Sequence, residues 1–193
     1  MKFLMLMMFS LSAFAIESGA PAPDFKLEGV SGKPVTLSSF KGKIVVVEWL
    51  NHGCPFVRKH YDSQNMQALQ RKYTKEGVVW LSVISSAEGK QGHVTAGEGL
   101  ADKTKNQSVA TDVLLDPKGT VGQLYGAKTT PHMFVVAKDG TLAYQGAIDD
   151  KADADKESVK GARNYVAEAV DSLMAGKKVA VASTKSYGCS VKY

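Results

Sequence analysis

The sequence predicts an α/β fold in which helices pack on a mixed β-sheet. Two apolar runs, 44–50 (broken only by Glu48) and 78–84, are typical of strands that are buried on both faces. Between them, residues 55–76 carry apolar side chains at helical spacing and end at Gly77. A β-hairpin and an amphipathic helix follow later in the chain, and this order of elements is typical of an α/β sandwich.

The other elements follow from turn residues and short apolar runs. In chain order we expect a Pro-rich entry at 19–24, a turn at 31–34, a strand at 35–37, a helix at 100–110, a strand at 113–115, a turn at 116–119, a short helix at 120–125, hairpin strands at 132–137 and 141–146, and a helix at 159–173. Residues 87–99 hold four glycines, and the sequence leaves open whether they form a lid or a long loop.

Composition narrows the class of protein. The 193 residues are 44% hydrophobic and 22% charged, which are ordinary values for a globular domain. The net charge of +5 comes from 24 basic and 19 acidic residues that are scattered along the chain, so we expect no nucleic-acid partner. Two cysteines are too few for a disulfide framework or a four-cysteine zinc site.

The first fifteen residues have the composition of a secretory signal peptide. Lys2 precedes an apolar run, and Ala13-Phe14-Ala15 is a small-x-small cleavage site. We therefore expect a signal peptide at 1–15, a domain at 16–176 and a C-terminal tail at 177–193 that carries Cys189. The mature protein would be periplasmic or secreted, without a membrane partner. The alternative is an N-terminal membrane anchor that stays in place.

Cys54 is the residue with the strongest chemical signal. It follows the strand at 44–50 by a short loop and opens a helix whose first turn contains Pro55. A thiolate at this position faces the unpaired N–H groups and the positive end of the helix, which lower the pKa of the thiol. The alternative is a cysteine that fills a small apolar space and does not react.

The chain resembles the thioredoxin-like redoxins, and within them the AhpC/TSA antioxidant group that includes the peroxiredoxins. The resemblance spans about residues 20–175. It is carried by Ala22-Pro23-Asp24-Phe25, by 33–43, by Asn51-His52-Gly53-Cys54-Pro55-Phe56-Val57, by Asp116 with Tyr125-Gly126-Ala127, by Thr129-Thr130-Pro131, and by Asp139-Gly140 before Tyr144-Gln145-Gly146. It implies a thioredoxin-like fold, with a central mixed β-sheet flanked by helices and an N-terminal β extension.

The resemblance also implies roles for individual residues. Cys54 matches the attacking cysteine of thioredoxins and the peroxide-reacting cysteine of peroxiredoxins. Thr130 and Pro131 match a cis-proline loop that lies against this sulfur and can hold an extended partner chain. Glu48 matches a buried acid, and a desolvated carboxyl with a raised pKa could pass a proton to or from the sulfur. Alternatively, Glu48 lies at the strand end and reaches water.

The chain departs from both family patterns near Cys54. Thioredoxins have a second cysteine where this chain has Val57, so no disulfide can close within the motif. Peroxiredoxins have Thr or Ser where this chain has Asn51, and Pro where it has Val47. Asn51 could still donate a hydrogen bond to a peroxide oxygen. Arg58 lies one helical turn beyond Cys54 and could stabilise the thiolate, or it could lie on a solvated helix face.

Cys189 is the only other thiol, and its role stays open at this point. It could resolve a sulfenic acid that forms on Cys54. It could instead form a static disulfide with Cys54, or remain unpaired or bind another molecule.

Other groupings carry weaker signals. His52 and His132-Met133 could converge near Cys54 and bind Cu(I), but a second nearby cysteine is missing, so we expect no metal site. The acidic run 149–157 lacks the glycine of a Ca²⁺ loop, and we expect it to cap the last helix. No organic cofactor motif is present in the sequence, and sulfur chemistry needs none.

The sequence thus predicts a thiol-dependent oxidoreductase in which the Cys54 thiolate attacks a peroxide or a protein disulfide. Cys189 or an external thiol reductant would then resolve the intermediate. Glu48 would relay protons, and Asn51, Pro55, Arg58, Thr130 and Pro131 would contact substrate. The alternatives are thiol-disulfide exchange without peroxidase activity, and a non-catalytic binding module that carries copper or holds a locked bridge between the two cysteines.

Overall fold

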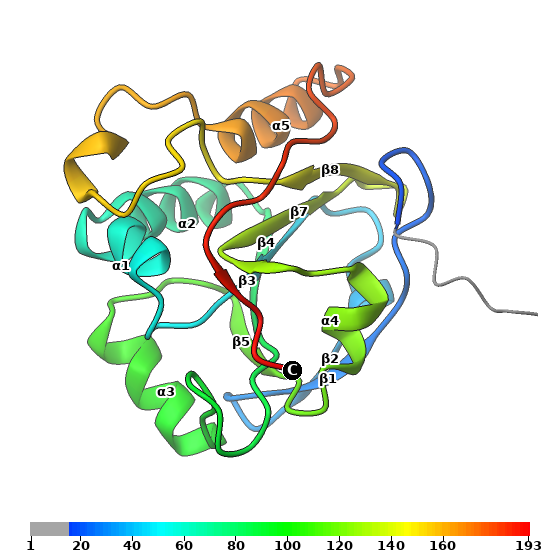
Figure 1. The fold of residues 1–193 in the computed structure, drawn as a ribbon. Coiled ribbons are helices and arrows are strands. Elements are labelled where there is room, and N and C mark those ends of the chain that lie inside the picture. Colours follow the sequence, from blue (N-terminus) through cyan, green and yellow to red (C-terminus); the bar gives the residue numbers. More distant parts are fainter. Residues whose placement is uncertain (1–15) are drawn as a thin grey trace, which may run out of the picture.

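The structure, a computed structural model, describes residues 16–193. The predicted signal peptide lies outside the described residues. A seven-stranded mixed sheet runs through the centre in the order β2-β1-β5-β4-β3-β7-β8 (Figure 1). Its strands are β1 (Lys26–Gly29), β2 (Pro34–Thr36), β3 (Val45–Trp49), β4 (Val79–Ile84), β5 (Asp112–Leu115), β7 (His132–Val136) and β8 (Leu142–Gly146).

The strands β3, β4 and β5 are parallel, and the outer strands pair antiparallel with them and with each other. The predicted β-hairpin is β7 and β8, and the hairpin of β1 and β2 extends the sheet beyond β5. The expected mixed sheet and its N-terminal β extension are therefore confirmed.

Alternation along β3 divides the core between the two faces of the sheet. Val46 faces a cluster that α1, α2 and α5 cover, whereas Val45 and Val47 face a second cluster beside α4. The helices are α1 (Pro55–Asp62), α2 (Asn65–Lys75), α3 (Ala96–Lys105), α4 (Thr120–Tyr125) and α5 (Tyr165–Met174), with short 3₁₀ turns η1 (Leu37–Phe40) and η2 (Lys156–Val159). Figure 1 shows α1, α2 and α5 together on one side of the sheet.

Three helices differ from the sequence prediction, and one of them, α5, begins at Tyr165 rather than at Val159. The segment 55–76 is not one helix, because Gln64 adopts a left-handed conformation (φ 61°) and separates α1 from α2. The helix expected at 100–110 begins earlier, at Ala96. Thr95 and Glu98 form a capping box there, in which each side chain accepts a hydrogen bond from the other residue's backbone.

The acidic run 149–157 also differs from its predicted role. Asn164, not an acid of this run, caps α5 by accepting a hydrogen bond from the Ala167 backbone at 2.9 Å. Asp155 instead caps the short turn η2. Asp149 and Asp150 do lie beside the start of α5, but their partners are Asn164 and Arg163, which precede the helix, and neither carboxylate caps it.

The C-terminal segment 177–193 crosses the front of the molecule, from α5 to the edge of α4 (Figure 1). Near its end, the short strand β9 (Cys189–Ser190) pairs antiparallel with β6 (Thr129–Thr130). The sequence offers no strand signal here, because the pairing joins segments about sixty residues apart. Within the described part of the chain, none of the helices is long and apolar enough to cross a bilayer.

Candidate functional site

Cys54 lies between the end of β3 and the start of α1. It is the N-cap residue of α1, with Pro55 in the first turn, and its side chain is fully buried. Pro55 suits this position because its missing N–H would have no partner there. The predicted junction between a buried strand and a helix N-terminus is therefore present.

The sulfur of Cys54 contacts the strand that precedes a cis-proline. Its thiol donates to the Thr130 carbonyl at 3.1 Å, and the Thr130–Pro131 peptide is cis, as the family resemblance implied. The Thr130 hydroxyl is buried and has no hydrogen-bond partner among the described residues. When Cys54 is a thiolate this hydroxyl can donate to it, and that side-chain hydrogen bond is one of the causes that lower the pKa of Cys54.

Cys189 lies against Cys54, although 135 positions separate them in the sequence. The pairing of β9 with β6 places Cys189 opposite Thr130, the residue whose carbonyl accepts the Cys54 thiol. Both cysteines are free thiols; Cys54 is buried, whereas Cys189 is partly exposed. The sequence motif lacks a second cysteine, and the fold supplies one from the C-terminal segment.

The two thiols have different affinities for a proton. Burial raises the pKa of Cys54, but hydrogen bonds from the Cys189 side chain and backbone, from the Val57 backbone and from Thr130 outweigh it, and the net pKa is lowered. Burial and the hydrogen bond to Cys54 raise the pKa of Cys189 to about 11. When the pair loses one proton, the charge therefore resides on Cys54.

A buried polar cluster holds the C-terminal segment just before Cys189. The Tyr187 hydroxyl donates to Asp149 at 2.5 Å and lies 3.0 Å from Nε2 of His60, while the Tyr187 ring packs on Phe56 of α1. The ammonium group of the buried Lys59 lies 3.9 Å from the Asp149 carboxylate. These side chains fix Tyr187 to the helix that Cys54 opens.

Backbone contacts fix the segment on the other side of Cys189. Val191 donates its N–H to the Lys128 carbonyl at 3.1 Å, and the Lys192 carbonyl accepts from Ala87 at 2.8 Å. The Tyr193 hydroxyl donates to the Ala127 carbonyl at 2.7 Å. Cys189 is thus held in place by contacts on both sides of it in the chain.

Glu48 is fully buried on β3 and does not reach water. Its carboxylate accepts from Trp80 at 2.9 Å, from Ser82 at 3.0 Å and from Tyr61 at 3.1 Å, with Gln70 more distant at 3.5 Å. Burial raises its pKa, and these hydrogen bonds oppose the rise. The buried acid that the family resemblance implied is therefore present.

A tyrosine and a histidine lie between this acid and the loop of Cys54. Tyr61 donates to Glu48, and its ring packs edge-on against His52 with the ring centroids 5.0 Å apart. Nδ1 of His52 is buried without a hydrogen-bond partner among the described residues. No hydrogen bond in the described chain joins Glu48 to Cys54 directly, so a proton relay remains a prediction.

Asn51 braces the loop that carries Cys54. Its side-chain oxygen accepts a hydrogen bond from the Gly53 backbone N–H at 2.9 Å. Its side-chain NH₂ group donates to the backbone carbonyl of Gln91 at 3.2 Å. Gln91 in turn donates to the Gly53 carbonyl at 3.2 Å. The Gly-rich segment therefore packs directly on the Cys54 loop, and both polar groups of Asn51 are already bonded within the protein.

Arg58 points along the surface of α1. Its guanidinium pairs with Asp62 one turn further on and donates to Asn106 at 2.6 Å. No hydrogen bond or ion pair within residues 16–193 joins Arg58 to Cys54. The predicted contact with the thiolate therefore has no support from the geometry.

His132 and Met133, which could have bound Cu(I) together near Cys54, do not converge. His132 and Met133 are neighbours on β7, so their side chains lie on opposite faces of the sheet. Met133 belongs to the core cluster of Cys54, whereas the His132 ring packs against Phe134 of the other cluster. Among the described residues, no group of three or more His, Cys, Asp or Glu side chains could hold a metal ion.

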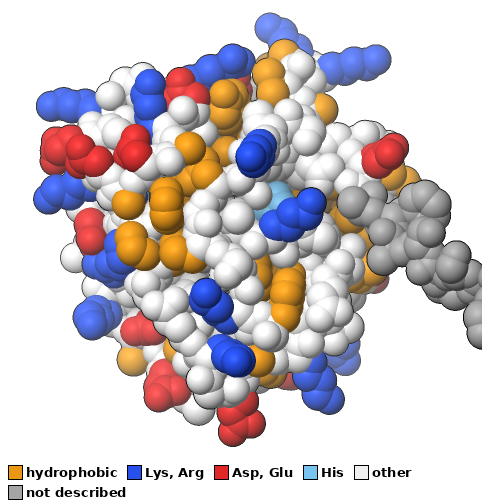
Figure 2. Space-filling model, viewed as in Figure 1, with side chains coloured by type: hydrophobic (Ala, Val, Ile, Leu, Met, Phe, Trp, Pro, Cys, Tyr) orange, Lys and Arg blue, Asp and Glu red, His pale blue; other side chains and the backbone are white. Residues whose placement is uncertain are grey.

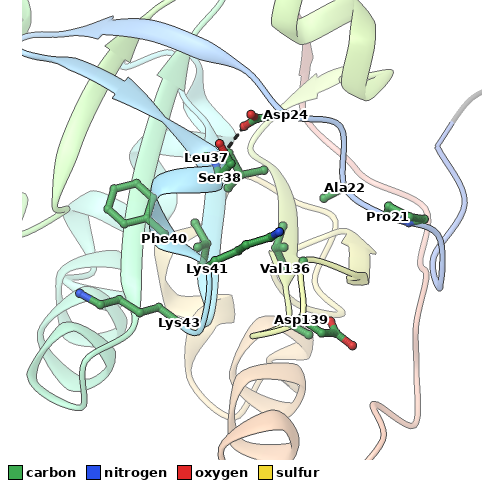
Figure 3. A pocket seen from close by; sticks show the side chains of 13 residues that line it. Pro21, Ala22, Asp24, Leu37, Ser38, Phe40, Lys41, Lys43, Val136 and Asp139 are labelled. Atoms are coloured by element: carbon green, nitrogen blue, oxygen red, sulfur yellow. Dashed lines mark hydrogen bonds between the residues drawn. The ribbon is translucent and has the colours of Figure 1, made fainter.

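The structure also has a mainly apolar pocket far from the cysteines. It is lined by residues at the beginning of β3 and the end of β7, together with Asp24, Leu37 and Phe40 (Figure 3). The Asp24 carboxylate accepts a hydrogen bond from the Ser38 backbone N–H. Because Cys54 follows the opposite end of β3, this pocket takes no part in its chemistry.

Comparison with known proteins agrees with this geometry. The model of the AhpC/TSA family matches residues 18–145. The thioredoxin-like protein YneN of Bacillus subtilis is 27% identical over 134 residues, which cover 69% of this chain and 74% of YneN.

Two solved structures show the same fold. The crystal structure of a candidate thiol:disulfide interchange protein, DsbE, from Chlorobium tepidum is 30% identical, with a TM-score of 0.53 over 68% of this chain and 85% of that one. The hypothetical protein SMc02350 of Sinorhizobium meliloti is 24% identical, with a TM-score of 0.78 over 93% and 96% of the two chains. The chain therefore belongs to the AhpC/TSA family and has a thioredoxin-like fold.

Proposed function

We propose that the protein is a thiol-disulfide oxidoreductase whose redox pair is Cys54 and Cys189. The observation that carries the proposal is the pairing of β9 with β6, which brings the two thiols together and gives them unequal proton affinities. The similarity to a thiol:disulfide interchange protein supports the same chemistry.

The proposed reaction uses only the two sulfurs and an external disulfide. The Cys54 thiolate attacks one sulfur of the external disulfide, and the other sulfur leaves as a thiolate. Cys189 loses its proton to that leaving thiolate and attacks the mixed disulfide at Cys54. The second external thiolate then leaves, and an intramolecular disulfide remains, so the protein loses two electrons and the external disulfide gains them.

Pro55, Thr130 and Pro131 are the substrate-contacting residues in this proposal, because they surround Cys54. Glu48 is proposed to affect proton transfer at the pair. Arg58 and Asn51 have partners elsewhere in the protein, and their predicted roles depend on those contacts opening.

A small peroxide is a second candidate oxidant. The observation in its favour is that β9 covers Cys54, so a molecule with two oxygens reaches the sulfur more easily than a protein does. The Cys54 thiolate would become a sulfenic acid as the peroxide leaves as an alcohol or water, and Cys189 would condense with it and release water.

We also propose that residues 1–15 are a cleaved signal peptide and that the protein works outside the cytoplasm, in the periplasm or after secretion. The support is the apolar run and the Ala13-Phe14-Ala15 site, together with a cysteine pair that an oxidising compartment would use. Residues 16–176 would form the redoxin domain, and residues 177–193 would be the segment that supplies Cys189.

The test is to follow the reduced mature protein by intact mass after adding oxidised glutathione or hydrogen peroxide. We expect the loss of two hydrogen atoms in the wild type, whereas Cys189→Ser should stop at an adduct or an acid on Cys54, and Cys54→Ser, which lacks the attacking thiolate, should stay unmodified. Ser190→Ala, next to Cys189 but without a sulfur, is the matched control and should oxidise like the wild type. If neither oxidant closes the disulfide, the proposal is wrong; if only oxidised glutathione does so, the peroxide alternative is wrong.

A further inference from the structure

A pocket of about 420 Å³ lies beside the β6–β9 pair. Lys128, Thr129 and His132 form one wall, and residues 183–186 of the C-terminal segment form another. Thr129 pairs with Ser190, the residue after Cys189, so the pocket borders the β6–β9 pair that carries Cys189. This pocket has no role in the mechanism described so far.

His132 supplies a fixed hydrogen-bond donor to this pocket. Its Nδ1 accepts from the Lys128 backbone at 3.2 Å, so the proton of the neutral ring resides on Nε2. Burial lowers the pKa of His132 to about 4, and the ring is therefore neutral near pH 7. No described residue is hydrogen-bonded to Nε2.

The charge at the pocket is positive. Lys128 and Lys185 are exposed at its edge, neither forms an ion pair among the described residues, and none of the described lining residues is acidic. Figure 2 shows this face of the molecule, with Lys and Arg side chains along its middle and acidic side chains mainly toward its rim. Cleavage after Ala15, as proposed above, would add the ammonium of Ile16, another lining residue.

Access and leaving-group chemistry distinguish the two sulfurs of the oxidised protein. Cys54 is buried under β9, whereas Cys189 is partly exposed. Attack on Cys189 also expels the Cys54 thiolate, which has the lower pKa and is the better leaving group. An external thiol therefore meets less resistance at Cys189.

We propose that this pocket binds the carboxylate of a small thiol, and that this thiol opens the intramolecular disulfide by attacking Cys189. The inference rests on the proposed redox pair. The external thiolate forms a bond to Sγ of Cys189 while the bond between the two cysteine sulfurs breaks and the electron pair leaves on Cys54. A second thiol then attacks the mixed disulfide and gives an external disulfide and the reduced protein.

The first experiment maps the mixed disulfide. Oxidised wild-type protein is mixed with glutathione, and its free thiols are blocked with N-ethylmaleimide at short times. Trypsin then separates the two cysteines into peptides 44–58 and 186–192. We expect glutathione on Cys189 in at least about tenfold excess over Cys54. In urea, where both sulfurs are exposed, the two peptides should carry similar amounts.

The second experiment tests the carboxylate. Reduction rates are measured with glutathione and with cysteamine, which has no carboxylate, at equal thiolate concentration. We expect the wild type to prefer glutathione, and the double variant Lys128→Ala/Lys185→Ala to lower the ratio of the two rates about fivefold or more. Lys177→Ala, an exposed lysine beyond α5, is the matched control and should keep the wild-type ratio.

The outcomes separate the two proposals. A disulfide that never closes would overturn the proposed function, and this inference with it. A disulfide that closes, but opens with glutathione on Cys54, would overturn the inference alone. A rate ratio that is the same in the wild type and in the double variant would also overturn the carboxylate site.

Discussion

Gly188 controls the contact between the two cysteines, and Gly188→Ala should make the disulfide easier to reduce. Gly188 has φ of 127°, a conformation that side chains rarely adopt. A Cβ atom there would collide with the Thr130 carbonyl oxygen and would lie 2.8 Å from the carbonyl carbon. Alanine at this position therefore strains β9 whenever β9 is docked.

The size of the effect follows from the strain. A residue with a side chain that is forced into such a backbone conformation costs about 1–3 kcal/mol of strain energy. The reduced protein can relieve the strain by moving β9 away, but the disulfide holds Cys189 against Cys54. The substitution should therefore destabilise the oxidised protein by about 1–3 kcal/mol relative to the reduced protein. This difference raises the reduction potential by about 20–60 mV.

The assay is equilibration in glutathione redox buffers, followed by acid quenching, alkylation and intact mass. Gly176→Ala is the matched control, because Gly176 also has a positive φ (68°) but a Cβ atom there would meet nothing within 4 Å. It should lower stability without changing the potential. If Gly188→Ala has the same reduction potential as the wild type, the docking of β9 does not govern the redox pair.

Two further predictions concern the buried polar groups. Tyr187→Phe removes a hydroxyl that is bonded to two buried side chains, so unfolding in urea should show a loss of about 1–3 kcal/mol, whereas Tyr165→Phe should show little change. Burial lowers the pKa of His52 and His132 to about 4 and that of His60 to about 3. The unfolded chain binds protons near pH 6.5 that the folded protein does not, so stability is complete above pH 6.5 and falls toward pH 4, by about 2 kcal/mol per histidine between pH 7 and 5. Urea unfolding at these two pH values measures the loss, and equal stability at both would contradict the assigned neutral state of the three rings.

The sequence predicted the elements whose signals are local. The buried strands β3 and β4 have mainly apolar runs, and the Asp-Gly turn identifies the hairpin of β7 and β8. The capping box of Thr95 and Glu98 was also available as a local signal, and it would have placed the start of α3 correctly. The break at Gln64 has no such signal, because glutamine is common in helices.

The candidate site was predictable only in part for the same reason. Cys54 is visible in the sequence because its strand, loop and helix are contiguous. The position of Cys189 depends on β9 pairing with β6, and neither two-residue strand is long enough to show a period. The cluster of Lys59, Asp149 and Tyr187 likewise joins residues far apart in the chain, each of which alone has the pattern of an ordinary surface residue.

The delivery of Cys189 by a docked segment couples redox chemistry to the position of that segment. In a motif with both cysteines on one helix turn, spacing alone keeps the sulfurs together; here Val57 occupies the local position and lies in the core. Docking of β9 favours the disulfide, and by reciprocity the disulfide stabilises the docked segment by the same free energy. Any substitution that loosens residues 177–193, at Tyr187 or at Gly188, should therefore raise the reduction potential in proportion to the docking energy that it removes. Substitutions elsewhere in the core should lower stability and leave the potential unchanged.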